Sequence, residues 1–149
     1  MTTSTHTPTI RYYEDVEVGG QIPQLVKEPM TLYRLVRYAG ASGDFNPLHY
    51  DDGFATRVGF PSVIAQGMFT AGVLSHYASD WLGLDNIRKY AVQFRSPLFP
   101  EKKITFKGTV TRKYKEGDEN LVDCDLEVVT NDGETVLKGS CTAALPSRG

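Results

Sequence analysis

The chain has 149 residues, of which 40% are hydrophobic and 23% are charged, a composition typical of a soluble domain long enough to bury a sizeable core. Its formal net charge of −2 gives no reason to expect a nucleic acid or an anionic membrane surface as a partner. No apolar run approaches the roughly 20 residues that a membrane-spanning helix requires.

Residues 1–10 are predicted to be a short disordered lead, and residues 11–149 to form one domain. The lead lacks the basic start and the apolar stretch of a secretory signal, which favours the cytoplasm. Cys124 and Cys141 fall on the apolar positions of two strand-like segments, without the spacing of a metal site. We expect two small buried side chains, and the sequence leaves a disulfide between them open.

The first half of the chain has helical patterns. Residues 24–28 are expected to form a short edge strand that Pro29 ends, and Thr31 has the chemistry of a helix N-cap. Behind Thr31, apolar residues recur at helical spacing, and this helix is predicted to end near Gly40. The apolar positions are Leu32, Leu35, Val36 and Ala39.

Two more helices are predicted before the pattern changes. Asp51 and Asp52 place negative charge at the start of a short helix, for which Gly59 is a natural end. A longer helix is predicted over about residues 66–82, with Gly83 beyond it. Because this helix is apolar almost all round, we expect other structure to wrap it.

From residue 89 onward the hydrophobic period changes from 3.6 to 2, which indicates strands with one wet face and hence an antiparallel sheet. Asn131-Asp132-Gly133 is a strong hairpin turn between the last two strands. Helices followed by strands indicate an α+β domain, in which the sheet curls around the apolar helix. The alternating segments are residues 90–94, 104–110, 122–128 and 137–143.

The segment 38–49 carries a carboxylate, Asp44, and an imidazole, His49, in a stretch that suits neither a helix nor a strand. Gly43 frees the backbone there, while Pro47 fixes one dihedral angle and removes a donor. Such a loop is suited to acid–base chemistry. The alternative is a turn in which the aspartate caps a helix and the histidine packs. The chemistry of the residues alone does not decide between them.

Three motifs in the same order resemble those of the MaoC-like, or hydratase 2, family, and the resemblance covers the chain from about residue 33 to residue 100. They are Ser42-Gly43-Asp44 with Asn46-Pro47-Leu48-His49 and Ala55 behind them, then Ile64-Ala65-Gln66-Gly67-Met68, then Phe94-Arg95-Ser96-Pro97-Leu98-Phe99-Pro100. The resemblance implies a hotdog fold, in which a curved antiparallel sheet encloses a long helix and two subunits usually pair.

The resemblance also implies hydration of a trans-2-enoyl thioester to the (R)-3-hydroxyacyl thioester, or the reverse dehydration, without a metal or redox cofactor. Coenzyme A or acyl carrier protein would carry the substrate. Asp44 and His49 match the family's catalytic pair, and Gly67 matches the residue whose backbone N–H meets the thioester carbonyl. The supporting positions are Ser42, Asn46 and Gln66, and the substrate-binding candidates are Met68, Phe69 and Arg95.

These roles agree with the chemistry of the residue types. Adding water to a conjugated double bond requires a base for the water and an acid for the α-carbon, and a carboxylate and an imidazole that hold one water supply both. Negative charge then develops on the thioester oxygen, where a backbone N–H at a helix start stabilises it. The sequence does not decide which member of the pair is the base. It also does not single out the contacts for the carrier's phosphates; Arg88, Arg95, Lys102 and Lys103 are available.

The sequence departs from the family pattern at two points. Gln66 stands where many relatives have histidine, and we expect it to support the loop, because the acid and the base are already present. Glu101-Lys102 stands where relatives often have Gly-Asp, which we interpret as a variation in a surface turn.

Several other functions stay open at this point. The chain can pair with itself, or it can be the catalytic half of a heteromeric dehydratase, because it has the acid–base set that a non-catalytic half lacks. A hotdog thioester hydrolase, which directs water to the carbonyl carbon, is the alternative enzyme. A structural or acyl-binding module is disfavoured because it has no need of an acid–base pair.

Overall fold

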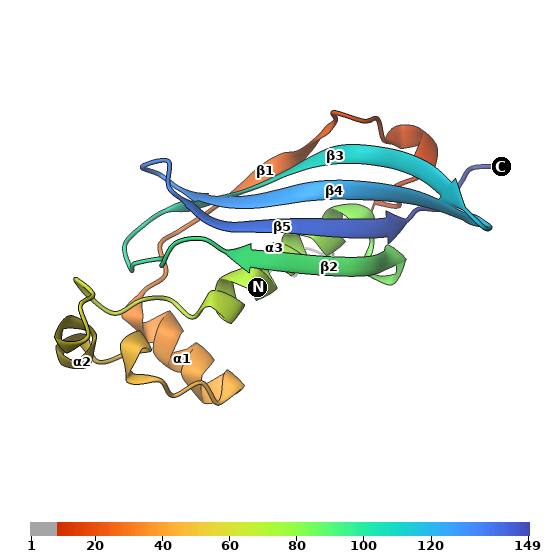
Figure 1. Cartoon of the computed structure of the whole chain (residues 1–149). Coiled ribbons are helices and arrows are strands. Elements are labelled where there is room, and N and C mark those ends of the chain that lie inside the picture. The colour runs from red at the N-terminus through yellow and green to blue at the C-terminus, as the bar shows by residue number, and fades with distance from the viewer. Residues whose placement is uncertain (1–8) are drawn as a thin grey trace, which may run out of the picture.

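A five-stranded antiparallel sheet and one long helix form the frame of the computed structural model, which describes residues 9–149 (Figure 1). The strand order is β1-β3-β4-β5-β2. The strands are β1 (Gln21–Lys27), β2 (Ile87–Phe94), β3 (Ile104–Glu116), β4 (Glu119–Thr130) and β5 (Thr135–Ala144). The helices are α1 (Leu32–Ser42), α2 (Asp52–Arg57) and α3 (Gly67–Leu82), with short 3-10 turns η1 (Tyr13–Asp15), η2 (Pro47–His49) and η3 (Leu84–Asn86).

The predicted lead, residues 1–10, falls largely outside the described residues; only its last two positions are described, and both are exposed. Within residues 9–149, no helix is both long enough and apolar enough to cross a bilayer.

The inner face of the sheet is built from the alternating apolar residues, as predicted. Phe106 of β3, Val128 of β4 and Leu137 of β5 are fully buried in one core. Cys124 and Cys141 lie directly opposite each other in the β4–β5 pair, and both are buried free thiols. The predicted hairpin turn joins β4 to β5.

The helix α3 lies against the inner face of the sheet, the arrangement of a hotdog fold. Tyr77 donates to the Ile22 carbonyl of β1 at 3.2 Å, and Tyr90 of β2 donates to the Ala71 carbonyl of α3 at 2.7 Å. The helix is therefore fixed to both edges of the sheet. Its opposite side is exposed, at Met68, Gly72, His76 and Asp80, so this chain covers only part of the helix that we expected to be wrapped.

The predicted helix ends are close to the observed ones. The Thr31 hydroxyl accepts from the Arg34 amide at 3.4 Å and caps α1, which continues past Gly40 because Gly43 (φ 75°) is the residue that adopts the left-handed conformation. Asp51 caps α2 by accepting from the Phe54 amide at 2.9 Å. Figure 1 shows α1 and α2 together at one end of the molecule, below the sheet.

The first strand differs from its prediction. It begins at Gln21 rather than at residue 24 and includes Pro23. A proline is tolerated there because β1 is an edge strand and its pairing with β3 shifts register between Ile22 and Leu25.

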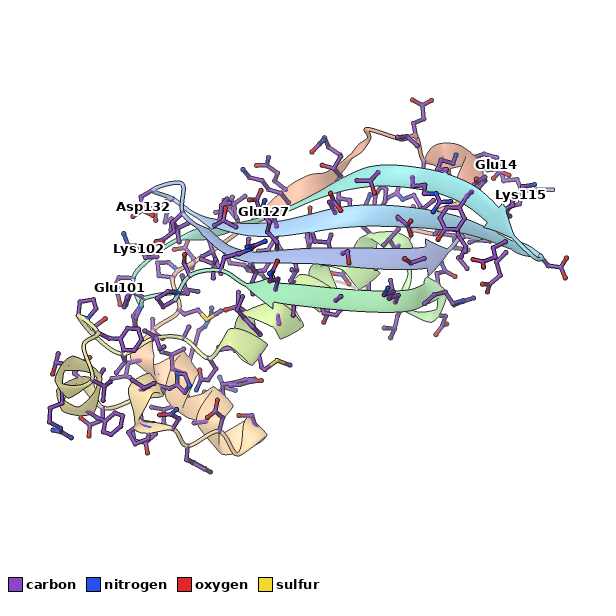
Figure 2. The ribbon with its side chains drawn as sticks, viewed as in Figure 1. Glu14, Glu101, Lys102, Lys115, Glu127 and Asp132 are labelled. Carbon is purple, nitrogen blue, oxygen red and sulfur yellow. The ribbon has the colours of Figure 1, made fainter. Side chains whose placement is uncertain are left out.

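The turn at Glu101 has an unusual backbone. Glu101 has φ 69° and is the one non-glycine residue with positive φ in the part of the chain that the structure describes. Beside it, the Lys102 ammonium lies 2.5 Å from a carboxylate oxygen of Asp132, which joins the β2–β3 connection to the β4–β5 hairpin (Figure 2). A glycine, which the resemblance implies at this position, would adopt this conformation without strain.

Candidate active site

The end of α1 fixes the backbone that carries Asp44. The Gly43 amide donates to the Ala39 carbonyl at 2.9 Å and closes the helix. The Ser42 hydroxyl donates to the Tyr38 carbonyl at 2.7 Å and accepts from the Asp44 amide at 3.2 Å. Ser42 therefore ties the acid to the last turn of α1.

A second set of contacts orients the Asp44 carboxylate. The Asn46 amide donates to Asp44 Oδ1 at 3.3 Å, and Asn46 Oδ1 accepts from the Leu48 amide at 3.1 Å. Pro47 occupies the first position of η2, where its fixed φ suits a helical turn and its missing N–H costs nothing. The turn delivers His49 toward the side of Asp44.

His49 is the buried member of the pair, with 10% of its side chain exposed against 43% for Asp44. Its Nδ1 lies 2.7 Å from the Ile64 carbonyl oxygen. A carbonyl can only accept, so the proton of the neutral imidazole resides on Nδ1 and Nε2 carries the lone pair. Nε2 faces Asp44 Oδ2 at 3.5 Å, which is longer than a direct hydrogen bond.

The other half of the site is the start of α3. Gln66 is its N-cap residue but makes no side-chain cap; instead its Nε2 donates to the Leu35 carbonyl of α1 at 3.0 Å. The amides of a first helical turn have no acceptor within the helix, and they lie at the positive end of its dipole. The Gly67 N–H is the first of these amides.

Gly67 has a steric requirement as well. A Cβ at this position would lie 2.6 Å from Cε1 of Phe94, the last residue of β2. The Phe94 ring is 53% exposed and rests where a side chain of residue 67 would stand. The ring and the glycine together form one wall beside the helix start.

The three predicted substrate-binding residues lie in different surroundings. Arg95 lines a cavity of about 280 Å³ together with Gly67, Thr70 and Ile64. Met68 is 63% exposed, whereas Phe69 stacks on Tyr38 with ring centroids 4.7 Å apart and lines a second cavity. Ile64 connects the two halves of the site, because its carbonyl receives His49 and the residue also borders the cavity beside Gly67.

Sequence reasoning missed three parts of this arrangement: the Ile64 carbonyl, the Leu35 carbonyl and the packing of Phe94. The two carbonyls belong to the backbone, and because every residue has a backbone carbonyl, the residue type cannot predict their role. Phe94 is the first residue of the third motif, so the sequence could have singled out this residue, but it could not have predicted the contact of Phe94 with Gly67. Two buried polar atoms near the site, Gln66 Oε1 and Thr70 Oγ1, have no partner among the described residues.

No group of three or more His, Cys, Asp and Glu side chains is placed to hold a metal ion in the part of the chain from residue 9 onward. The site as described is one carboxylate, one imidazole and one uncapped helix start.

Comparison with known proteins identifies the family. The model of the MaoC like domain matches residues 16–132. The 3-hydroxybutyryl-CoA dehydratase of Methylorubrum extorquens is 30% identical over 135 residues, 87% of this chain and 84% of the relative. The (R)-specific enoyl-CoA hydratase of Rhodospirillum rubrum is 28% identical, over 94% of this chain and 95% of the relative. The solved (R)-hydratase of Aeromonas caviae has a TM-score of 0.75 at 26% identity, covering 89% of this chain and 99% of that one. The chain belongs to the MaoC-like hydratase and dehydratase family.

Proposed function

We propose that this protein catalyses the (R)-specific hydration of trans-2-enoyl thioesters to (R)-3-hydroxyacyl thioesters, or the reverse dehydration. The observation that carries the proposal is the pairing of Asp44 Oδ2 with the unprotonated Nε2 of His49 at 3.5 Å. The names of the relatives support the same reaction class.

The geometry favours His49 as the group that takes the proton of the attacking water. Its Nδ1 is committed to the Ile64 carbonyl, so only Nε2 can accept. As the water oxygen bonds to the β-carbon of the substrate, its proton passes to Nε2. The Asp44 carboxylate then stabilises the imidazolium. The pair returns one proton to the α-carbon, so the net change is the addition of one water with no redox step.

The thioester oxygen gains negative charge when the double bond is attacked. We assign the Gly67 N–H as its donor, because this amide has no acceptor within α3 and lies at the positive end of the helix dipole. One such donor typically contributes about 10²–10³ in rate. Gln66 supports this element without titrating, since its side chain anchors the helix start to α1 through Leu35.

The test is Asp44→Asn, which keeps the shape of the side chain and removes its charge. We expect turnover of crotonyl-CoA, followed by loss of the conjugated absorbance, to fall by about 10²–10⁴. Chiral analysis of the product of the wild-type protein should find the (R) enantiomer. Asp80→Asn is the matched control, because it makes the same change in an exposed carboxylate that faces a histidine, His76, at 3.5 Å near the other end of α3. Near-wild-type turnover in Asp44→Asn contradicts the proposal, and release of free thiol without hydration identifies a thioester hydrolase instead.

We also propose that the working unit is a pair of copies joined along β2. The two edges of the sheet, β1 and β2, differ. β1 carries Pro23 beside a register shift in the middle of the strand, features that discourage further pairing. β2 is eight residues long and contains no proline, and its one register shift lies at its start, between Ile87 and Lys89. β2 ends at Phe94, so a second copy there would lie beside Gly67. A related but different subunit on the same edge is the alternative, which the mass of the purified chain distinguishes.

A further inference from the structure

Three of the four cations expected to meet the carrier's phosphates are occupied, and the fourth, Arg95, borders the cavity beside Gly67. Arg88 pairs with Glu119 at 2.8 Å and Lys102 with Asp132 at 2.5 Å, while Lys103 lies 3.9 Å from Glu28. In contrast, none of the ion pairs formed within residues 9–149 involves Lys27, Arg34 or Arg37. Three basic side chains outside the predicted set are therefore free to meet an anion.

These three residues border one cavity of about 440 Å³, which lies between α1 and α3. We call it the α1–α3 groove. It is lined by Arg34, Arg37 and Tyr38 of α1, by Phe69 and Val73 of α3, and by Lys27 of β1. Its lining is mostly apolar, with the stacked pair of Tyr38 and Phe69 inside it, and its cations stand at positions that are exposed. Glu28 also borders it, and its charge is partly offset by Lys103.

The groove runs toward the catalytic loop. Its lining residues on α1 continue from Arg34 to Ala41, which is the residue before Ser42. From Arg34 to Ser42 there are eight residue steps of about 1.5 Å each, so the cations begin about 12 Å along the helix axis from the start of the loop. An arm that binds an anionic group at one end and reacts at the other needs this kind of separation.

We infer that the α1–α3 groove binds the phosphate-bearing arm of the substrate's carrier, with Lys27, Arg34 and Arg37 as its anion contacts. The inference rests on the proposed function for the identity of the ligand. The phosphopantetheine arm belongs to coenzyme A and to acyl carrier protein alike. Arginine suits phosphate because its planar fork donates two parallel hydrogen bonds, and the apolar wall of the groove suits the uncharged part of the arm.

Calorimetric titration with coenzyme A tests the groove without requiring turnover. We expect Arg34→Gln/Arg37→Gln to raise the Kd about 10–100-fold, since charge-assisted hydrogen bonds are lost. Arg112→Gln is the matched control, because this exposed arginine stacks on Tyr114 at the end of β3. No binding by the wild type, or equal Kd values for the double variant and the control, would overturn the inference. Thermal unfolding midpoints verify that both variants fold.

Two competing ligands distinguish the source of the phosphate. Displacement of coenzyme A by 4′-phosphopantetheine identifies the phosphate shared with carrier protein, and displacement only by adenosine 3′,5′-bisphosphate identifies the nucleotide end. The first result supports the groove as the site of the arm, whereas displacement by the nucleotide alone, or by neither ligand, overturns it.

Turnover separates this inference from the proposed function. For the double variant, the ratio of kcat/KM on crotonyl-CoA to kcat/KM on the crotonyl N-acetylcysteamine thioester, which has no phosphate, should fall about 10–100-fold through KM. A wild type that binds coenzyme A but hydrates neither thioester refutes the hydratase and leaves the groove. A wild type that hydrates both, with an unchanged ratio in the variant, refutes the groove alone.

Discussion

At the scale of single residues, the site depends on side chains whose positions are fixed by the backbone of other elements. His49 is set by the Ile64 carbonyl, and Gln66 holds the start of α3 through the Leu35 carbonyl. Both contacts join segments far apart in sequence, so a small shift of either segment changes the geometry of the acid–base pair. The most sensitive position of this kind is Gly67, where Phe94 leaves no room for a Cβ.

Gly67→Ala should therefore move either the ring of Phe94 or the start of α3. The added Cβ would lie 2.6 Å from Phe94 Cε1, a distance that forces displacement. We expect the free energy of unfolding to fall by about 1–3 kcal/mol, as for other overpacked sites. Turnover should fall by about 100-fold, because the N–H that we propose as the donor to the thioester oxygen is displaced. Urea unfolding and the crotonyl-CoA assay measure the two effects.

A second substitution shows whether Phe94 is the cause. In Gly67→Ala/Phe94→Ala the clash is removed, so the double variant should regain stability relative to the sum of the two single changes. Gly40→Ala is the control, since a Cβ there meets no atom within 4 Å. Strict additivity of the two single changes would show that the ring and the helix start are independent.

The sequence singled out Asp44, His49 and Gly67 as candidates, because each is a residue type with distinctive chemistry in a recognisable motif, and the structure places Asp44 and His49 side by side. It did not predict the tautomer of His49, which depends on a backbone carbonyl fifteen residues away. Glu101 lies in an exposed turn, as predicted, but the sequence did not predict its φ of 69°. In each case the missing information was a backbone conformation or contact rather than a side-chain type.

At the scale of elements, the period of the hydrophobic pattern predicted where the helices and strands lie, but it did not predict the order of the strands in the sheet. The switch from a period of 3.6 to a period of 2 placed the helices and the last four strands correctly. The order β1-β3-β4-β5-β2 depends on non-local hydrogen bonds that no local pattern encodes. The β4–β5 hairpin, in contrast, was predicted from its turn, and its register brings Cys124 of β4 opposite Cys141 of β5 inside the core.

These thiols make the β4–β5 pair sensitive to alkaline pH. Burial raises the pKa of Cys124 to about 12 and that of Cys141 to about 11, from an ordinary value of 9.0. The native state thus holds both protons more tightly than the unfolded state. Their contribution to stability is complete below about pH 9 and is lost as the pH rises through about 11 to 12.

The urea midpoint should therefore fall between about pH 8 and about pH 10.5, and it should fall less steeply in Cys124→Ala/Cys141→Ala. Tyr77 and Tyr90, whose pKa values burial raises to about 12, keep part of the slope in that variant. In the native protein at pH 8 neither thiol should react with a thiol reagent, while both react in urea. Rapid labelling of the native protein would contradict this account.

At the scale of the whole molecule, α3 and β2 are both incompletely covered. The sequence made α3 apolar almost all round, yet the chain buries only its sheet-facing side and leaves Met68 63% exposed. Within residues 9–149, no strand pairs with the outer edge of β2. Because Phe94 of β2 touches the space at Gly67, a partner on this edge would border both the exposed part of α3 and the proposed reaction centre.

Proline substitutions in the middle of β2 test this assembly, because neighbouring N–H groups along an antiparallel strand point to opposite edges. Of Ala91→Pro and Val92→Pro, one removes a donor from the free edge and the other from the ladder with β5. The wild type should have the mass of a dimer by light scattering. The first kind of variant should be a folded monomer with reduced turnover, and the second should have a lower unfolding midpoint. A fully active monomeric wild type, or dimers in both variants, would exclude β2 as the contact. Dimers in both variants would place the contact on the exposed side of α3 instead, where Gly72 and His76 lie.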